Sequence, residues 1–214
     1  MSETLSTAAT GASAEDAQPA QTPSSAPTGA ILHLSKSTIR HLEPSDAAEL
    51  TRIADNPAVG RFLRDRFPAP YTRADADWWI AHNQRARPVR SFAIADPRDG
   101  RIMGCVGLEP GADVHARGAE LGYWLGEEYW GRGIVGEVVP AFARWAFARF
   151  ADLERIYVGV FAENTASVKV VERAGFVFEG RQRKAAFKSG RFMDVLGYSF
   201  IRDDLEEEKS QEGA

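Results

Sequence analysis

The chain has 214 residues, a length that suits one domain with a sizeable core and two terminal tails. Its single cysteine, Cys105, excludes an internal disulfide framework and a cysteine-rich zinc site, and it favours a reducing compartment. The four histidines show no i, i+4 spacing, so we expect no metal site. No apolar run approaches membrane-spanning length, and no signal peptide opens the chain. We therefore expect a cytoplasmic protein with no membrane partner.

The charge of the chain is unevenly distributed. The formal net charge is −4; residues 1–35 carry −3 and residues 203–214 carry −5, which leaves +4 for residues 36–202. A mildly basic centre suits a polyanionic ligand. The basic residues are too few and too scattered to form the basic face of a nucleic-acid-binding protein, so we expect no nucleic-acid partner.

Composition divides the chain into three parts. Residues 1–30 are rich in Ala, Ser, Thr and Pro and almost without large apolar side chains, so they cannot bury enough surface to offset their ordering entropy. We expect a disordered tail there, one folded domain over residues 31–202, and an acidic tail over residues 203–214. No interface pattern stands apart from the core pattern, so no oligomeric state is predicted.

The first half of the domain begins with one or two short strands between Ile31 and Leu42. Pro44 opens a helix that Asn56–Pro57 ends, and Thr72 can cap a second helix with Asp75 at its third position. Strands follow at residues 91–95 and 101–108, joined by a hairpin loop at residues 96–100. Two glycines in the second strand, Gly104 and Gly107, indicate a bulge or a close backbone approach.

Residues 120–136, ELGYWLGEEYWGRGIVG, begin as a strand and end in the first turn of a helix. Apolar residues alternate from Glu120 to Leu125, and helical spacing begins at Ile134 and runs to about Phe150. The first amides of a helix have no internal partner, and the helix dipole adds partial positive charge there. Gly131 and Gly133 would let a phosphate approach this backbone without a Cβ in the way. The pattern therefore predicts a diphosphate site, to which Arg132 can add a charge-assisted hydrogen bond.

A simpler interpretation is that these glycines only make a tight turn from strand to helix. The stretch is not a Walker loop, because the Gly-Lys-Ser/Thr end is missing. It is not the dinucleotide-binding fingerprint either, because its last glycine stands at the wrong offset.

The second half of the domain continues with a strand at residues 155–161 and a short helix within residues 163–176, ENTASVKVVERAGF. Asn164 can cap this helix, and Gly175 can end it in the left-handed conformation. Two more strands, 177–188 and 191–201, meet at a hairpin turn. Their basic residues are expected to be solvated, and some could flank a substrate. The order of elements predicts an α/β fold of the α+β kind, with a central mixed sheet flanked by helices.

Two of these stretches resemble the GNAT acetyltransferases, in particular their RimJ/RimL-like branch. The family pattern Q/R-x-x-G-x-G/A falls on residues 130–135, where Gly133 matches and Trp130 and Val135 depart from the general form. The departure at Val135 costs little if the loop binds through N–H groups, which every non-proline residue has. The sequence ENxxSxxVxExxGF resembles the helix that packs beside the pantetheine arm in this branch. The resemblance covers about residues 37–201.

The resemblance implies transfer of an acetyl group from acetyl-CoA to a primary amine by direct attack in a ternary complex. The acceptor would be a protein N-terminus or a small amine. It implies a catalytic Ser167, which would protonate the departing thiolate. It also implies the following cofactor-binding residues: Trp124, Leu125, Gly131, Arg132, Gly133, Ile134, Val135, Gly136 and Asn164. For Asn164 a purely structural capping role stands beside the cofactor role.

The attacking amine must be neutral, so a proton acceptor is expected near it. Glu120 is the candidate base, acting directly or through water, and Glu109 is the competing candidate. A carboxylate at residue 120 could instead bind the acceptor ammonium or be an ordinary solvated strand end. A function from another class, an acyl-CoA-binding module that senses the cofactor without turnover, is the alternative.

Overall fold

A computed structural model describes residues 29–205 of the chain. The expected N-terminal tail, residues 1–30, lies outside the described residues except for its last two. Of the expected acidic tail, only residues 203–205 are described, and they belong to a helical turn over 202–205. Leu205 packs against the main core, and the Ile201 amide donates to Asp204 Oδ2 at 2.8 Å. The described helical turn therefore includes residues 203–205, which we assigned to the acidic tail.

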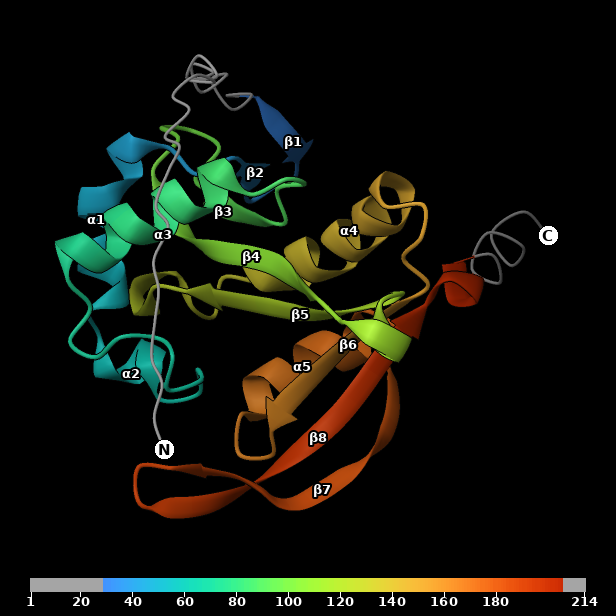
Figure 1. The fold of residues 1–214 in the computed structure, drawn as a ribbon. Coiled ribbons are helices and arrows are strands. Elements are labelled where there is room, and N and C mark those ends of the chain that lie inside the picture. The colour runs from blue at the N-terminus through green and yellow to red at the C-terminus, as the bar shows by residue number, and fades with distance from the viewer. Residues whose placement is uncertain (1–28, 206–214) are drawn as a thin grey trace, which may run out of the picture.

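One eight-stranded sheet forms the centre of the described domain, in the order β1-β2-β3-β4-β5-β6-β8-β7 (Figure 1). Its strands are β1 (Ala30–His33), β2 (Thr38–Arg40), β3 (Ser91–Ala95), β4 (Ile102–Pro110), β5 (Gly118–Leu125), β6 (Arg155–Phe161), β7 (Val177–Lys188) and β8 (Arg191–Ile201). The β5–β6 pair is parallel and the other neighbouring pairs are antiparallel. The expected mixed sheet is thus confirmed.

Helices cover both faces of this sheet. They are α1 (Ala47–Ala54), α2 (Pro57–Gly60), α3 (Arg73–Arg85), α4 (Ile134–Arg149) and α5 (Thr165–Arg173). In one core, α1 and α3 pack through Leu50 and Ile80 against Cys105 of β4. In the larger core, α4 packs through residues such as Phe142 against the other apolar side chains of the sheet. Figure 1 shows α1 to α3 gathered beside the strands of the first half, and α4 and α5 beside β5 and β6.

The ends of these helices follow the capping chemistry of the sequence. Thr72 and Asp75 form a capping box at the start of α3, as predicted. Asn56 caps α2 through the Ala58 amide, so the expected helix stop also starts the next short helix.

Pro140 lies inside α4 and removes one donor from its hydrogen-bond ladder. The predicted close approach at Gly104 is present, since a Cβ there would lie 2.1 Å from the Trp124 carbonyl oxygen.

The β7–β8 hairpin extends well beyond β6 and brings its tip to the loop between α2 and α3 (Figure 1). Lys188 Nζ, at the tip, donates to Asp65 Oδ1 at 2.7 Å, and the Lys188 side chain is only 14% exposed. We expected this lysine to be solvated. The prediction was wrong for Lys188, because its partner is 123 residues away along the chain and no local pattern indicates the contact.

The helices among residues 29–205 include none long and apolar enough to cross a bilayer.

Candidate active site

The site begins where two neighbouring parallel strands stop pairing. The β5–β6 register runs from Gly118–Arg155 to Glu120–Tyr157 and ends there, although β5 continues to Leu125 and β6 to Phe161. The β4–β5 register, in contrast, runs on to Leu125. The second half of β5 therefore keeps one sheet neighbour and has an open edge where β6 would be.

Backbone groups of alternate residues of β5 face this open edge. The carbonyl of Trp124 points towards Gly104 on β4, whereas the carbonyl of Leu125 points away and accepts a hydrogen bond from Trp130 Nε1 at 2.9 Å. Because consecutive residues of a strand turn their backbone groups to opposite sides, Tyr123 and Leu125 face the opening and Trp124 does not. The backbone groups of Leu125, a predicted cofactor-binding residue, therefore lie on the side of the opening. The backbone groups of Trp124 face β4, so Tyr123 rather than Trp124 turns its backbone to the opening beside Leu125.

The loop after β5 and the first turn of α4 form a concave stretch of backbone over residues 131–136, which we call the glycine cradle. Gly131 and Gly133 have φ of +71° and +73°, a left-handed conformation that glycine adopts without strain. Gly133 is the N-cap of α4 and no side chain caps the helix, so its first amides are available to an anion. Gly131, Arg132 and Gly133 are exposed, whereas Ile134 is buried in the core and anchors the loop. Val135 is partly buried and Gly136 is exposed.

Two cations lie near this cradle, and they are placed differently from expectation. The Arg132 guanidinium stacks 5.5 Å from the ring centroid of Tyr129. Lys36, from the turn between β1 and β2, places Nζ 2.8 Å from the position that a Cβ on Gly133 would occupy. Sequence reasoning missed Lys36, because it lies about a hundred residues before the loop and belongs to no motif.

The opposite wall of the opening carries a pair of hydroxyl groups. Ser167 Oγ of α5 lies 2.5 Å from Tyr123 Oη of β5, so the contact joins the end of one strand to the helix that follows the other. Asn164 caps α5 by accepting from the Ser167 amide at 3.2 Å, which confirms its structural role. That cap uses Oδ1, and an amide side chain carries Nδ2 as a separate donor.

Burial governs the chemistry of this hydroxyl pair. Desolvation raises the pKa of Tyr123 to about 12, and the hydrogen bond with Ser167 opposes that rise. The phenol therefore keeps its proton at neutral pH and can donate it. Sequence reasoning placed Tyr123 only as a strand residue, although its alternation with Leu121 and Leu125 was a usable signal.

The two candidate bases stand directly opposite each other on neighbouring strands. Glu109 of β4 pairs in register with Glu120 of β5, at the point where β6 diverges. Arg64 Nη2 donates to Glu120 Oε1, and Arg66 binds Glu109 through both of its terminal nitrogens. The hydrogen bonds from Arg66 lower the pKa of Glu109, which makes this carboxylate a weaker base. Glu120 is the less exposed of the two, at 19% against 48%.

Aromatic side chains line the same end of β5 on the side of α1 and α3. The Trp124 indole packs edge-on against Phe67 at 5.4 Å between ring centroids, and Phe67 packs against Tyr71 at 5.1 Å. Phe67 lies on the α2–α3 loop together with Arg64 and Arg66. Trp124 thus contributes a side-chain wall on the carboxylate side rather than backbone groups on the opening.

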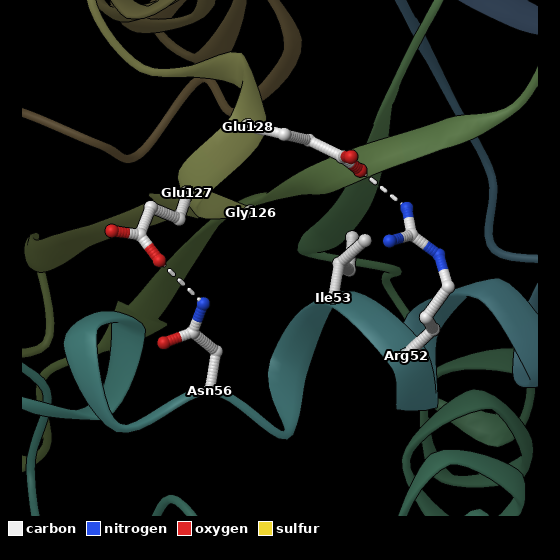
Figure 2. A pocket seen from close by; sticks show the side chains of 6 residues that line it. All are labelled: Arg52, Ile53, Asn56, Gly126, Glu127 and Glu128. Carbon is white, nitrogen blue, oxygen red and sulfur yellow. Dashed lines mark hydrogen bonds and ion pairs between the residues drawn. The ribbon is translucent and has the colours of Figure 1, made fainter.

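A hollow beside the turn after β5 shows how that turn is fixed to α1 and α2 (Figure 2). It is lined by Arg52, Ile53, Asn56, Gly126, Glu127 and Glu128. Arg52 donates to Glu128, and Asn56 Nδ2 donates to Glu127 Oε2 at 2.7 Å. These two contacts fasten the start of the glycine loop to the first helices.

The side chains of the described domain form no cluster of metal ligands. Over residues 29–205, no group of three or more His, Cys, Asp or Glu side chains could hold a metal ion.

The geometry of an open strand edge, a glycine cradle and a hydroxyl pair agrees with what comparison with known proteins finds. The Acetyltransferase (GNAT) domain family matches residues 36–177. The chain belongs to the GNAT acetyltransferase family. A Bacillus subtilis relative, "Probable N-acetyltransferase YjcK", is 30% identical over 181 residues, covering 79% of this chain and 96% of its own.

Solved structures of the family have the same fold. RimL, a ribosomal L7/L12 alpha-N-protein acetyltransferase in complex with coenzyme A, gives a TM-score of 0.70 at 21% identity, covering 82% of this chain and 99% of its own. Spermidine N-acetyltransferase from Vibrio cholerae, in complex with CoA and spermine, gives a TM-score of 0.67 at 24% identity. The match covers 79% of this chain and 98% of that chain. The predicted membership in the GNAT family, its RimJ/RimL-like resemblance and its fold are therefore confirmed. The protein is an N-acetyltransferase of a family that uses acetyl-CoA to acetylate amines.

The cradle gives a direct prediction for cofactor binding. Gly133→Asp places a carboxylate where a diphosphate would lie, so we expect acetyl-CoA to bind about 10- to 100-fold more weakly by calorimetry. Gly100→Asp is the matched control, since Gly100 has the same φ of +73° in the β3–β4 hairpin with open space around it. Equal acetyl-CoA affinities for the two folded variants would show that the cradle does not bind the diphosphate.

Proposed function

We propose that this protein transfers the acetyl group of acetyl-CoA to a primary amine, a protein N-terminus or a small amine, by direct attack in a ternary complex. The observation that carries this proposal is the opening between β5 and β6, with the glycine cradle at one end and the Tyr123–Ser167 pair across it. A thioester cofactor supplies an activated acetyl group when it is bound. The residues of the chain bind it, orient the amine and move the protons.

Cofactor binding follows from the cradle and from the open edge of β5. The amides at the start of α4, from Gly133 to Gly136, would hold the diphosphate. The edge at Tyr123 and Leu125 offers backbone groups to an extended amide-containing arm, as a neighbouring strand would. Asn164 Nδ2, at the start of α5, is a further donor for the same arm.

Glu120 receives the proton of the attacking amine in this proposal, directly or through one water. It stands where the strands diverge, and it is the better shielded of the two carboxylates. Arg64, which is 55% exposed, donates to it now, so an incoming ammonium would have to replace that guanidinium. An ammonium that is bound here first and then loses its proton gives Glu120 both roles that the sequence left open.

Tyr123 and Ser167 supply the proton that the departing thiolate takes up. The phenol holds its proton up to about pH 12, and its 2.5 Å contact with Ser167 lets either hydroxyl pass a proton to the other. Ser167 alone was the predicted donor. The pair makes a better donor, because Tyr123 can restore the proton that Ser167 gives up.

The acceptor is tested by calorimetry with acetyl-CoA followed by a panel of free amines and N-terminal peptides, with release of CoA as the readout. We expect binding of acetyl-CoA and amine-dependent CoA release, with the fastest acceptor defining the substrate class. Acetyl-CoA binding without release across the whole panel would favour the sensing module instead. No binding would contradict both.

The assignment of the base is tested by a pair of isosteric variants. Glu120→Gln should lower kcat by about 10²-fold, because the amide cannot take a proton, and it should leave the Kd for acetyl-CoA nearly unchanged. Glu109→Gln makes the same charge change on the opposite residue and should keep kcat within about threefold of the parent, since Glu109 is held by Arg66. If the kcat values of the two variants are reversed, Glu109 is the base.

The proton donor is tested on the departing side of the reaction. Tyr123→Phe and Ser167→Ala should each lower kcat by about 10- to 100-fold. The raised pKa of Tyr123 means that its proton is present below about pH 12, so the parent should show no loss of kcat from this group between pH 7 and 10. Tyr198→Phe removes another buried tyrosine hydroxyl, one that donates to Glu172, and should leave kcat unchanged. Parent-like kcat in both Tyr123→Phe and Ser167→Ala would remove the pair from the mechanism.

A further inference from the structure

The turn between β1 and β2 lies against the glycine cradle and brings a lysine to it. Lys36 Nζ is 2.8 Å from the position that a Cβ on Gly133 would occupy, so the ammonium lies in the space beside this glycine. The Lys36 side chain is about half exposed, at 48%. An ammonium in this place adds a full positive charge beside amides that carry only the partial charge of a helix start.

Glu137, in the first turn of α4, holds the β1–β2 turn in position. Ser35 Oγ donates to Glu137 Oε1 at 2.5 Å, and the Lys36 amide donates to Oε2 at 3.2 Å. The Lys36 ammonium itself stays 3.9 Å from Oε1, too far for a hydrogen bond. The carboxylate therefore fixes the backbone of the turn, while the ammonium reaches past it to Gly133.

The arginine of the loop does not occupy the same place. Sequence reasoning gave Arg132 the charged contact with the diphosphate, yet its guanidinium lies over the Tyr129 ring. Glu137 also puts a negative charge within the first turn of α4, where it would repel a diphosphate. A cation between the two would offset that repulsion, and Lys36 is the cation whose ammonium lies beside Gly133.

We propose that Lys36 is a binding residue for the cofactor diphosphate, held in place by Ser35 and Glu137 as positioning residues. The proposal rests on the proposed function, and it adds a contact from the first strands of the domain to the loop and helix already described.

The test measures the affinity of the protein for three ligands. Acetyl-CoA carries the diphosphate and the 3′-phosphate, 3′-dephospho-acetyl-CoA carries only the diphosphate, and S-acetylpantetheine carries neither. Lys36→Gln should weaken the first two by about tenfold, as expected for the loss of one charge-assisted hydrogen bond, and should leave S-acetylpantetheine affinity unchanged. Lys36→Arg should recover part of the loss. Lys184→Gln is the matched control, since it removes the same charge from the β7–β8 hairpin and should not change any of the three affinities.

Each outcome decides the proposal. Parent-like acetyl-CoA affinity in Lys36→Gln overturns it, and so does an equal loss for all three ligands, which would place the effect in the fold. A loss for acetyl-CoA that disappears with 3′-dephospho-acetyl-CoA also overturns it, because Lys36 would then bind the 3′-phosphate. If the parent protein binds none of the three ligands, the proposed function itself is wrong, and that result is distinct from the other three.

Discussion

The end of pairing between β5 and β6 is the constraint on which the rest of the site depends. Two parallel strands that begin in register at Gly118 and Arg155 lose contact after Glu120 and Tyr157, while each stays paired to its other neighbour. An unpaired strand edge inside a sheet is costly unless something satisfies its backbone groups. A ligand with an amide-containing arm can do so, and the family's cofactor has such an arm.

The divergence also separates the two kinds of chemistry in the site. Glu120 sits at the last paired position, and its side chain meets Arg64 and the α2–α3 loop. Tyr123 sits beyond it and meets Ser167 on α5. Only two residues, Leu121 and Gly122, thus separate the group that would take a proton from the pair that would give one.

Local patterns in the sequence predicted the elements well, and they predicted the parts of the site that belong to a single motif. The glycine loop, the α5 cap at Asn164 and the strand ending at Leu125 were all found, because each depends on neighbours within a few residues. The side chains that were missed depend on long-range contacts. Lys36 reaches Gly133, and Lys188 reaches Asp65, across separations that leave no periodic signal. Trp124 turns its backbone groups to β4 rather than to the opening, and periodicity could not show this, since it gives alternation but not which neighbour each residue faces.

The contact between the hairpin tip and the α2–α3 loop has a consequence for how such a protein can change over evolution. Lys188 and Asp65 fasten these two segments to each other, and residues 61–66 are absent from the apolar cores of the described domain. Substitutions in the loop and at the tip can therefore accumulate at little cost to folding, provided that the two segments still meet. The half of the molecule that would hold the cofactor is tied to the core through Ile134 and Leu125 and has far less freedom. One scaffold can in this way keep its acyl donor while natural selection exchanges the amine.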